Sequence, residues 1–180
     1  VVVGGSGFIG SHVADCLSES GYKVTIYDNI KSPWLRKDQK MVIGNILNFE
    51  ELKRITEGAK FVYNFAAIAD LNEASTMPIK TAEINILGNL NVLEACRINK
   101  IKRFVYASTM SVYGDQPDIP ITEEASTLPK SFYAVGKLAS EHYLDIYSKY
   151  NIDIVALRLF NVYGPGQNME NLKQGMVSIF

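Results

Sequence analysis

The chain has 180 residues, of which 47% are hydrophobic and 21% are charged, and its formal net charge is −1. This length is that of one domain, which can bury a core without disulfides or metals. The near-zero charge gives no electrostatic basis for binding nucleic acid or an anionic membrane, and no apolar stretch is long enough to span a bilayer.

Short β-branched stretches alternate with longer amphipathic stretches, which is typical of strand–helix–strand units around a parallel sheet. The prolines in and beside residues 114–128 indicate a loop. The sequence predicts an α/β fold, a doubly wound parallel sheet with helices on both faces and right-handed crossovers. Strands are expected at residues 1–3, 24–27, 41–43, 61–65, 103–107 and 154–159, and helices at residues 7–20, 49–57, 80–99 and 131–150.

The first expected helix carries Ile9, Val13, Cys16 and Leu17 on one face and ends at Gly21. Cys16 and Cys96 both lie in apolar helical patterns, so both are predicted to be buried free thiols. Reduced cysteines fit a cytoplasmic location. Because the chain has only two histidines, no metal site built on imidazoles is expected.

A glycine-rich turn, Gly4-Gly5-Ser6-Gly7-Phe8-Ile9-Gly10, follows the first expected strand and opens the first helix. Its glycines let the backbone approach a pyrophosphate without an intervening Cβ, and the helix N-terminus presents free N–H groups to phosphate oxygens. In this context the turn predicts a dinucleotide site. The alternative is a tight strand–helix turn that binds nothing.

Asp28 ends the second expected strand, about twenty residues after the glycine-rich turn, which is where dinucleotide-binding domains carry an acidic residue. Its carboxylate can accept hydrogen bonds from both ribose hydroxyls of the adenosine and would repel a 2′-phosphate. Lys31 and Arg36 follow closely and leave NADP as a rival. We nevertheless predict NAD as the cofactor.

Tyr133 and Lys137 are four residues apart on an expected helix, so both project from one face. A phenol is a weak base at neutral pH, but a nearby ammonium group favours the phenolate and lowers its pKa. Upstream, Ser108 and Thr109 follow the fifth expected strand, at the sheet edge where ligands bind in parallel α/β folds. A hydroxyl there can bond the substrate oxygen that Tyr133 deprotonates. The alternatives are a solvated helix pair and hydroxyls that terminate a strand.

Several short motifs occur in register along the chain: Gly4-x-x-Gly7-x-x-Gly10, Asp28-Asn29, Gly44-Asn45-Ile46, Asn64-Phe65-Ala66-Ala67, Asn85, Ser108-Thr109-Met110-Ser111-Val112-Tyr113-Gly114, Tyr133-x-x-x-Lys137 and Arg158-Leu159-Phe160-Asn161-Val162-Tyr163-Gly164-Pro165. Together they resemble the extended short-chain dehydrogenase/reductase superfamily, in particular its NAD-dependent epimerases of the UDP-glucose 4-epimerase type.

This resemblance implies a Rossmann fold, NAD as the cofactor and a nucleotide sugar, a UDP-sugar, as the substrate. It implies that Thr109, Tyr133 and Lys137 are catalytic, with Tyr133 as the base and Lys137 holding the nicotinamide ribose and depressing the tyrosine pKa. It assigns Thr109 and Asn161 to the substrate. The residues that it assigns to NAD binding are Gly4, Gly7, Phe8, Ile9, Gly10, Asp28, Asn29, Asn45, Ile46, Phe65, Ala66, Ala67, Ala69, Asn85, Ala107, Tyr133, Lys137 and Phe160.

The sequence departs from the family's pattern at a few of these positions. Asn45 stands where an Asp usually contacts adenine; its amide oxygen can still accept a hydrogen bond, so we expect weaker binding. Asn64 stands where His is common. Met110 and Ser111 occupy the positions at which dehydratases of the family carry an Asp-Glu pair, which argues against 4,6-dehydration.

The predicted reaction is epimerisation of a nucleotide sugar. Tyr133, assisted by Thr109, removes a proton from a sugar hydroxyl, and the 4-keto sugar turns over before the hydride returns to its opposite face. A nucleotide-sugar dehydrogenase, reductase or decarboxylase of the same family is an alternative. A non-catalytic NAD-binding protein is another.

Residues 1–165 are interpreted as the NAD-binding domain and residues 166–180 as the start of a truncated substrate-binding segment, because both ends of the chain interrupt apolar stretches. The resemblance also implies a homodimer formed through a four-helix bundle of residues 80–99 and 131–150. The apolar stripe Tyr143, Ile146 and Tyr147 fits such an interface, although core packing explains it equally well.

Overall fold

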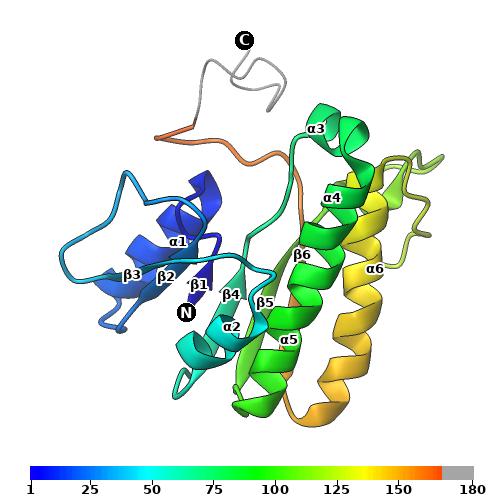
Figure 1. Cartoon of the computed structure of the whole chain (residues 1–180). Coiled ribbons are helices and arrows are strands. Elements are labelled where there is room, and N and C mark those ends of the chain that lie inside the picture. Colours follow the sequence, from blue (N-terminus) through cyan, green and yellow to red (C-terminus); the bar gives the residue numbers. More distant parts are fainter. Residues whose placement is uncertain (168–180) are drawn as a thin grey trace.

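The structure, a computed structural model, describes residues 1–167, and six strands within that range form one parallel sheet. The strand order is β3-β2-β1-β4-β5-β6 (Figure 1). The strands are β1 (Val2–Val3), β2 (Thr25–Asp28), β3 (Lys40–Ile43), β4 (Phe61–Asn64), β5 (Arg103–Thr109) and β6 (Asp153–Leu159). The order reverses between β1 and β4, and such a switch point opens a crevice at the carboxyl ends of the strands. The predicted doubly wound sheet is confirmed.

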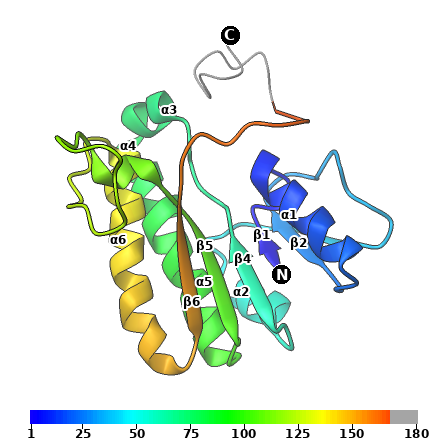
Figure 2. The same cartoon turned by 180° about the vertical axis from the view of Figure 1, so that it is seen from behind.

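Helices lie on both faces of the sheet, but unequally. On one face α1 (Phe8–Glu19) packs against β1 and β2. The other face is covered by α2 (Phe49–Thr56), α5 (Asn89–Ile98) and α6 (Phe132–Tyr147). Figure 2 shows that, within the described chain, no helix covers β5 and β6 on the α1 side.

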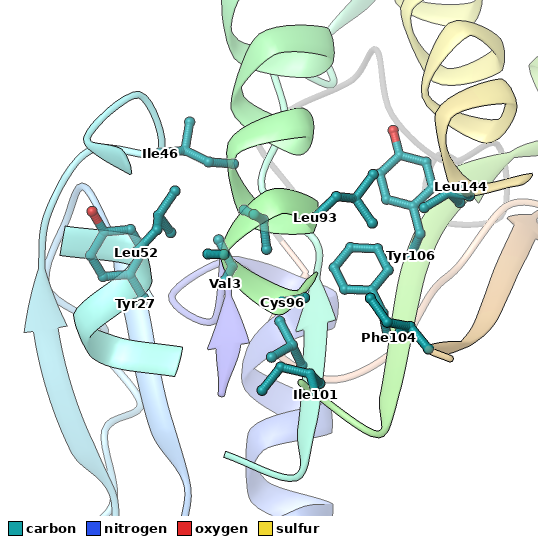
Figure 3. Packing of buried hydrophobic residues seen from close by; sticks show 14 residues of the cluster. Val3, Tyr27, Ile46, Leu52, Leu93, Cys96, Ile101, Phe104, Tyr106 and Leu144 are labelled. Carbon is teal, nitrogen blue, oxygen red and sulfur yellow. The ribbon is translucent and has the colours of Figure 1, made fainter. Parts of the chain in front are cut away.

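The main core lies between the sheet and α2, α5 and α6. Successive strand residues point to opposite faces, so Val3 faces this core while Val2 faces α1. Figure 3 shows Tyr106 and Phe104 of β5 packed between Leu93 of α5 and Leu144 of α6. This layer holds α6 against β5, which matters because both elements carry predicted site residues.

The helix predicted over residues 80–99 is longer and less regular than expected. It begins with α4 (Pro78–Ala82), passes through a π-helical segment, η1 (Glu83–Gly88), and continues as α5. Pro78 at the first helical position is a start signal that the sequence-based interpretation did not use. The segment is preceded by α3 (Leu71–Thr76), a short polar helix that was not predicted, although Asp70 caps it by accepting N–H bonds from Asn72 and Glu73.

The apolar face of α1 is only partly buried: Leu17 packs against the core. The helix packs on the sheet through the small residues Gly10 and Ala14, whereas Ile9 and Val13 are only half-buried. Cys16 is an exposed free thiol, so its predicted burial is wrong; Cys96 is buried as expected. The cause is the close approach of α1 to the turn before it, which leaves room only for small side chains.

The remaining segments are short. After β5 the chain forms a 3₁₀ turn, η2 (Met110–Tyr113), and residues 114–131 then form neither helix nor strand, which includes the loop predicted at residues 114–128. A second 3₁₀ turn, η3 (Ser148–Tyr150), links α6 to β6. The predicted substrate-binding segment at residues 166–180 lies outside the described residues, apart from Gly166 and Gln167.

Candidate active site

The glycine-rich turn joins β1 to α1 at the switch point of the sheet. Gly4 has a φ of +77°, and a Cβ there would lie 2.4 Å from the backbone nitrogen of Ala66. A Cβ on Gly10 would lie 2.2 Å from the carbonyl oxygen of Gly4. These two glycines therefore permit the close packing of the turn against α1 and the β4 loop. Gly7 is less crowded, since its Cβ would meet only that same carbonyl oxygen, at 3.4 Å.

Two cavities of about 550 and 430 Å³ meet at this turn. The larger, which we call the Asp28 cavity, is lined by Asp28, Asn29 and residues from the loops after β3 and β4. The smaller, which we call the Tyr133 cavity, is lined by Thr109, Tyr133 and residues after β6. Both are also lined by Gly4, Gly7, Phe65 and Ala67. Because they share these walls, they form one elongated cleft with the glycine-rich turn at its middle.

This cleft brings together nearly all of the predicted site residues. Every residue assigned from the sequence to NAD or substrate, except Asn85, lines the Asp28 cavity or the Tyr133 cavity. A dinucleotide needs one cavity for each nucleoside, with backbone N–H donors for the pyrophosphate between the two cavities. The cleft meets both requirements, so the residues present fit NAD.

Asp28 stands at the carboxyl end of β2, as its place in the motif predicts. Its Oδ2 accepts a hydrogen bond from the backbone N–H of Ser6 (2.9 Å), and its Oδ1 accepts a longer one from the N–H of Ile30 (3.3 Å). The Ser6 hydroxyl in turn donates to the carbonyl oxygen of Ile30 (2.9 Å). The carboxylate is thus fixed between the glycine-rich turn and the loop after β2, with acceptor capacity left for ribose hydroxyls.

Asn45 lines the Asp28 cavity, but its side-chain oxygen is already engaged. Oδ1 accepts the backbone N–H of Leu47 (2.9 Å), and the carbonyl oxygen of Asn45 accepts the Tyr27 hydroxyl (2.8 Å). An amide offers one acceptor atom where a carboxylate offers two. Weaker binding at the adenine end stays a prediction.

Asn85 lies behind the cleft rather than on its surface. It is 2% exposed, and its amide accepts from the N–H of Ile68 (2.8 Å) and donates to the carbonyl oxygen of Ile68 (3.0 Å). The Ser140 hydroxyl of α6 donates to the Asn85 carbonyl oxygen. Asn85 thus anchors the loop after β4 that walls both cavities, and its direct contact with NAD stays a prediction.

Thr109, Tyr133 and Lys137 converge in the Tyr133 cavity from β5 and α6. Ser131 caps α6 by accepting the N–H of Ala134 (3.1 Å), which fixes the start of the helix one turn before Lys137. Lys137 is 2% exposed; its Nζ donates to the carbonyl oxygen of Ala107 (2.7 Å) and lies 5.7 Å from the centroid of the Tyr133 ring.

Burial dominates the electrostatics of Tyr133 and Lys137. Burial raises the pKa of the Tyr133 phenol, and a hydrogen bond with the Thr109 side chain acts in the opposite direction. Burial lowers the pKa of Lys137 from 10.5 to about 7. Burial is therefore the larger influence on the phenol, and the depression of its pKa by Lys137 stays a prediction.

Other residues around the cleft were not found from the sequence. Three of them line the Asp28 cavity: Ile68 from the loop after β4, Glu73 from α3 and Lys80 from α4. Glu73 and Lys80 were missed because the starts of α3 and α4 were not predicted. Glu141 lies one helical turn beyond Lys137 and is bonded to Ser108 and Arg158. Its spacing of four residues from Lys137 was a usable signal, because it places both side chains on one helix face.

Within residues 1–167, no group of three or more His, Cys, Asp and Glu side chains is arranged to hold a metal ion. None of the helices in that range has both the length and the apolar character to cross a bilayer. The cytoplasmic location stays a prediction.

The model of the NAD dependent epimerase/dehydratase family matches residues 1–180. A UDP-glucose 4-epimerase of Corynebacterium glutamicum is 30% identical over 94% of this chain and 54% of its own. Among solved structures, a UDP-glucose 4-epimerase of Thermotoga maritima with UDP-glucose matches with a TM-score of 0.93 and 34% identity, over 99% of this chain and 60% of its own.

A UDP-glucose 4-epimerase of Thermus thermophilus in complex with NAD matches with a TM-score of 0.88 and 35% identity, over 99% of this chain and 58% of its own. The chain thus spans about three fifths or less of the length of these relatives.

Proposed function

Because the chain belongs to the NAD-dependent epimerase/dehydratase family and NAD is its cofactor, we propose that it is the NAD-binding part of a nucleotide-sugar 4-epimerase acting on a UDP-sugar. The observation that carries the proposal is the meeting of Thr109, Tyr133 and Lys137 in a cavity continuous with the glycine-rich turn. UDP-glucose in the solved relative supports the substrate class.

NAD, when bound, supplies reversible hydride uptake from the sugar carbon. The residues of the chain supply position and proton transfer. Tyr133 accepts the proton of the sugar hydroxyl, and Thr109 bonds the same oxygen. Lys137, whose pKa lies at about 7, carries a charge in part of the molecules at neutral pH and then favours the phenolate of Tyr133. Asn161 lines the same cavity and is proposed to contact the diphosphate of the substrate.

The acid–base groups around the cavity favour epimerisation over dehydration. Removal of water from the sugar needs a second acid–base pair besides the tyrosine. Among the described residues, no Asp or Glu lines the Tyr133 cavity, and Met110 and Ser111 follow Thr109. A dehydrogenase, reductase or decarboxylase of the family also needs no such pair, so the experiment has to separate these from an epimerase.

We propose a homodimer as the assembly, formed through α6 and the helical segment before α5. Leu87 of η1 and Val135 and Ile146 of α6 are large apolar side chains exposed by 48%, 50% and 51%. In the proposed stripe only Ile146 is exposed, since Tyr143 and Tyr147 are half-buried against the core. Sedimentation of the full-length protein should give a dimer, and Val135→Glu should give monomers; a monomeric wild-type protein contradicts the assembly.

The activity is tested by incubating full-length protein with UDP-glucose or UDP-galactose and following sugar identity and absorbance at the NADH band together. Interconversion of the two sugars without net NADH supports an epimerase. Stoichiometric NADH would instead identify a dehydrogenase, and loss of the sugar carboxylate carbon from UDP-glucuronic acid a decarboxylase. Absence of conversion of any UDP-sugar overturns the proposal.

A further inference from the structure

An ionic cluster, partly exposed at its arginine, adjoins the Tyr133 cavity. Glu141 of α6 is 8% exposed, and Ser108, at the end of β5, is 3% exposed. The Ser108 hydroxyl donates to Oε1 of Glu141. Arg158 of β6 donates from Nε to Oε1 (3.1 Å) and from Nη2 to Oε2 (2.8 Å) of the same carboxylate. We call these three residues the Glu141 cluster.

The cluster joins the elements that carry the proposed catalytic residues. Ser108 and Arg158 are register partners on the adjacent strands β5 and β6, so both side chains face α6. Arg158 also donates to the carbonyl oxygen of Glu123 (3.2 Å), and its guanidinium lies 4.8 Å from the centroid of the Tyr113 ring in η2. One carboxylate thus ties α6 to two strands, and through Arg158 to the segment that follows Thr109.

The spacing along α6 relates this tie to the catalytic groups. Glu141 follows Lys137 by one turn and Tyr133 by two turns, and the side chains lie on one face. Lys137 bonds the carbonyl oxygen of Ala107, and Glu141 bonds the hydroxyl of the next residue, Ser108. Two successive residues of β5 therefore hold α6, immediately before Thr109. Rotation or sliding of the helix would break both contacts and move Tyr133 away from Thr109.

Stability alone is a poor explanation for such a cluster. The side chains of Arg158 and Glu141 are 26% and 11% exposed, and an ion pair that loses this much hydration is commonly no more stabilising than apolar side chains of similar volume. Its directional bonds do restrict geometry, however, and proton transfer depends on a tightly held distance between donor and acceptor.

We propose that Glu141 is a positioning residue for the reaction: held by Ser108 and Arg158, it fixes α6 against the end of β5 and so sets the place of Tyr133 relative to Thr109. This inference rests on the proposed function, since it concerns the same tyrosine. It assigns the Glu141 cluster a role in the arrangement of the site rather than contact with the sugar or with NAD.

The test removes one hydroxyl from the cluster in the full-length protein. Ser108→Ala deletes the donor to Glu141 and leaves the ion pair with Arg158 intact. Tyr147→Phe is the matched control, because the Tyr147 hydroxyl of α6 donates to Glu94 (3.0 Å), which is paired with Arg97 on α5, away from the cleft. Both variants lose one hydroxyl that donates to an arginine-bound glutamate.

We expect kcat for UDP-sugar conversion to fall by about tenfold in Ser108→Ala with KM unchanged, because a small displacement of a catalytic group lowers the rate of the chemical step. Tyr147→Phe should retain the kcat of the wild type. Equal kcat values in Ser108→Ala and the wild type would overturn the inference, as would an equal fall in both variants.

A second measurement is independent of turnover. In protein labelled with ¹³C at Cζ of tyrosine, with the Tyr133 signal assigned by Tyr133→Phe, the titration of Tyr133 should move to higher pH in Ser108→Ala, because the phenol loses its bond with Thr109. The neighbouring ionisable groups, Lys137 on α6 and Tyr106 on β5, are unchanged in both variants. If wild-type protein converts no UDP-sugar, the proposed function fails, and an unchanged titration separately contradicts the positioning role.

Discussion

The two cavities of the cleft are built from different parts of the chain in different ways. The Asp28 cavity is lined mainly by turns that directly follow β1, β2, β3 and β4, with side chains added from α3 and α4, and backbone N–H groups of these turns bond Asp28 and Asn45. The Tyr133 cavity depends on side chains from β5, α6 and the segment after β6, and buried polar bonds hold them in place. NAD binding by backbone groups of a turn depends on residues close together in the sequence. The proposed proton transfer depends on the alignment of side chains that lie far apart in the sequence.

Gly4→Ala should have the largest effect of the variants, because a shift of the glycine-rich turn moves all of its NAD-binding backbone groups together. The added Cβ would meet the Ala66 backbone at 2.4 Å, so the turn must shift and NAD affinity should fall by more than about a hundredfold. The measurement is NAD titration by calorimetry.

Gly21→Ala is the matched control for this variant. Gly21 has a similar φ of +82° but no atom within 4 Å of its Cβ position. It should cost about 1–2 kcal/mol of stability from the left-handed conformation alone and leave NAD affinity unchanged. If both variants bind NAD equally, steric closeness at Gly4 is not what shapes the cleft.

Asp28→Asn should have the next largest effect. Charge-assisted bonds from a carboxylate to ribose hydroxyls contribute about 1.5–3 kcal/mol, so NAD affinity should fall by roughly tenfold or more. Discrimination against NADP should shrink because the repulsion of a 2′-phosphate is removed. Asp38→Asn changes a carboxylate of the same loop that is paired with Arg36, and it should affect neither cofactor. An unchanged NAD/NADP ratio in Asp28→Asn would contradict the assignment.

Lys137→Met tests how much stability the protein loses by burying the Lys137 ammonium group in the Tyr133 cavity. The pKa of Lys137 lies at about 7 in the folded protein against 10.5 for an ordinary lysine. Below pH 7 Lys137 is charged in both the folded and the unfolded protein, and the folded protein bears the free-energy cost of burying that charge. Between pH 7 and 10.5 the unfolded chain binds a proton at Lys137 that the folded protein does not, so the free energy of unfolding rises with pH.

Removing the charge should therefore stabilise the protein most at low pH. We expect the unfolding temperature of Lys137→Met to exceed that of the wild type by about 2–4 °C near pH 6, and the gain to shrink as the pH rises from 7 towards 10.5, the pKa of the unfolded chain. The variant should also lose catalysis. A gain of the same size at every pH in this range would show that the buried charge is not the cause.

Asn45→Asp should have the smallest effect. The carboxylate would keep one oxygen for the N–H of Leu47 and offer the other to the adenine amino group. We expect NAD to bind a few times more tightly, in line with about 1 kcal/mol for one further hydrogen bond. Weaker binding would place the adenine elsewhere in the Asp28 cavity.

The sequence predicted the Asp28 cavity more completely than the support of the Tyr133 cavity, for the same physical reason. Gly4, Gly10 and Asp28 act within one strand–turn–helix–strand unit, so their spacing alone indicates their task. Glu141 and Arg158 meet only because β5, β6 and α6 pack together, and nothing local to either residue specifies the other. Cys16 was misplaced because an apolar pattern does not reveal that α1 approaches the sheet through Gly10 and Ala14.

The helix starts show a second limit. The helix before α5 was predicted to begin near residue 80, yet α3 and α4 occupy residues 71–82. Their apolar residues are too few to give a helical period, and only the caps, Asp70 and Pro78, indicate them. Lys80 and Glu73 were overlooked in the Asp28 cavity for that reason.

The central claim is that the glycine-rich turn and Asp28 bind NAD independently of the proton-transfer group in the Tyr133 cavity, and Tyr133→Phe in the full-length protein tests it most directly. NAD affinity and the rate of UDP-sugar conversion are measured on the same preparation. The rate should fall by about a thousandfold, as expected for loss of a general base, while NAD affinity stays within about threefold of the wild type because the turn and Asp28 are untouched. Conversion at the wild-type rate, or NAD affinity lost together with the rate, would contradict this account.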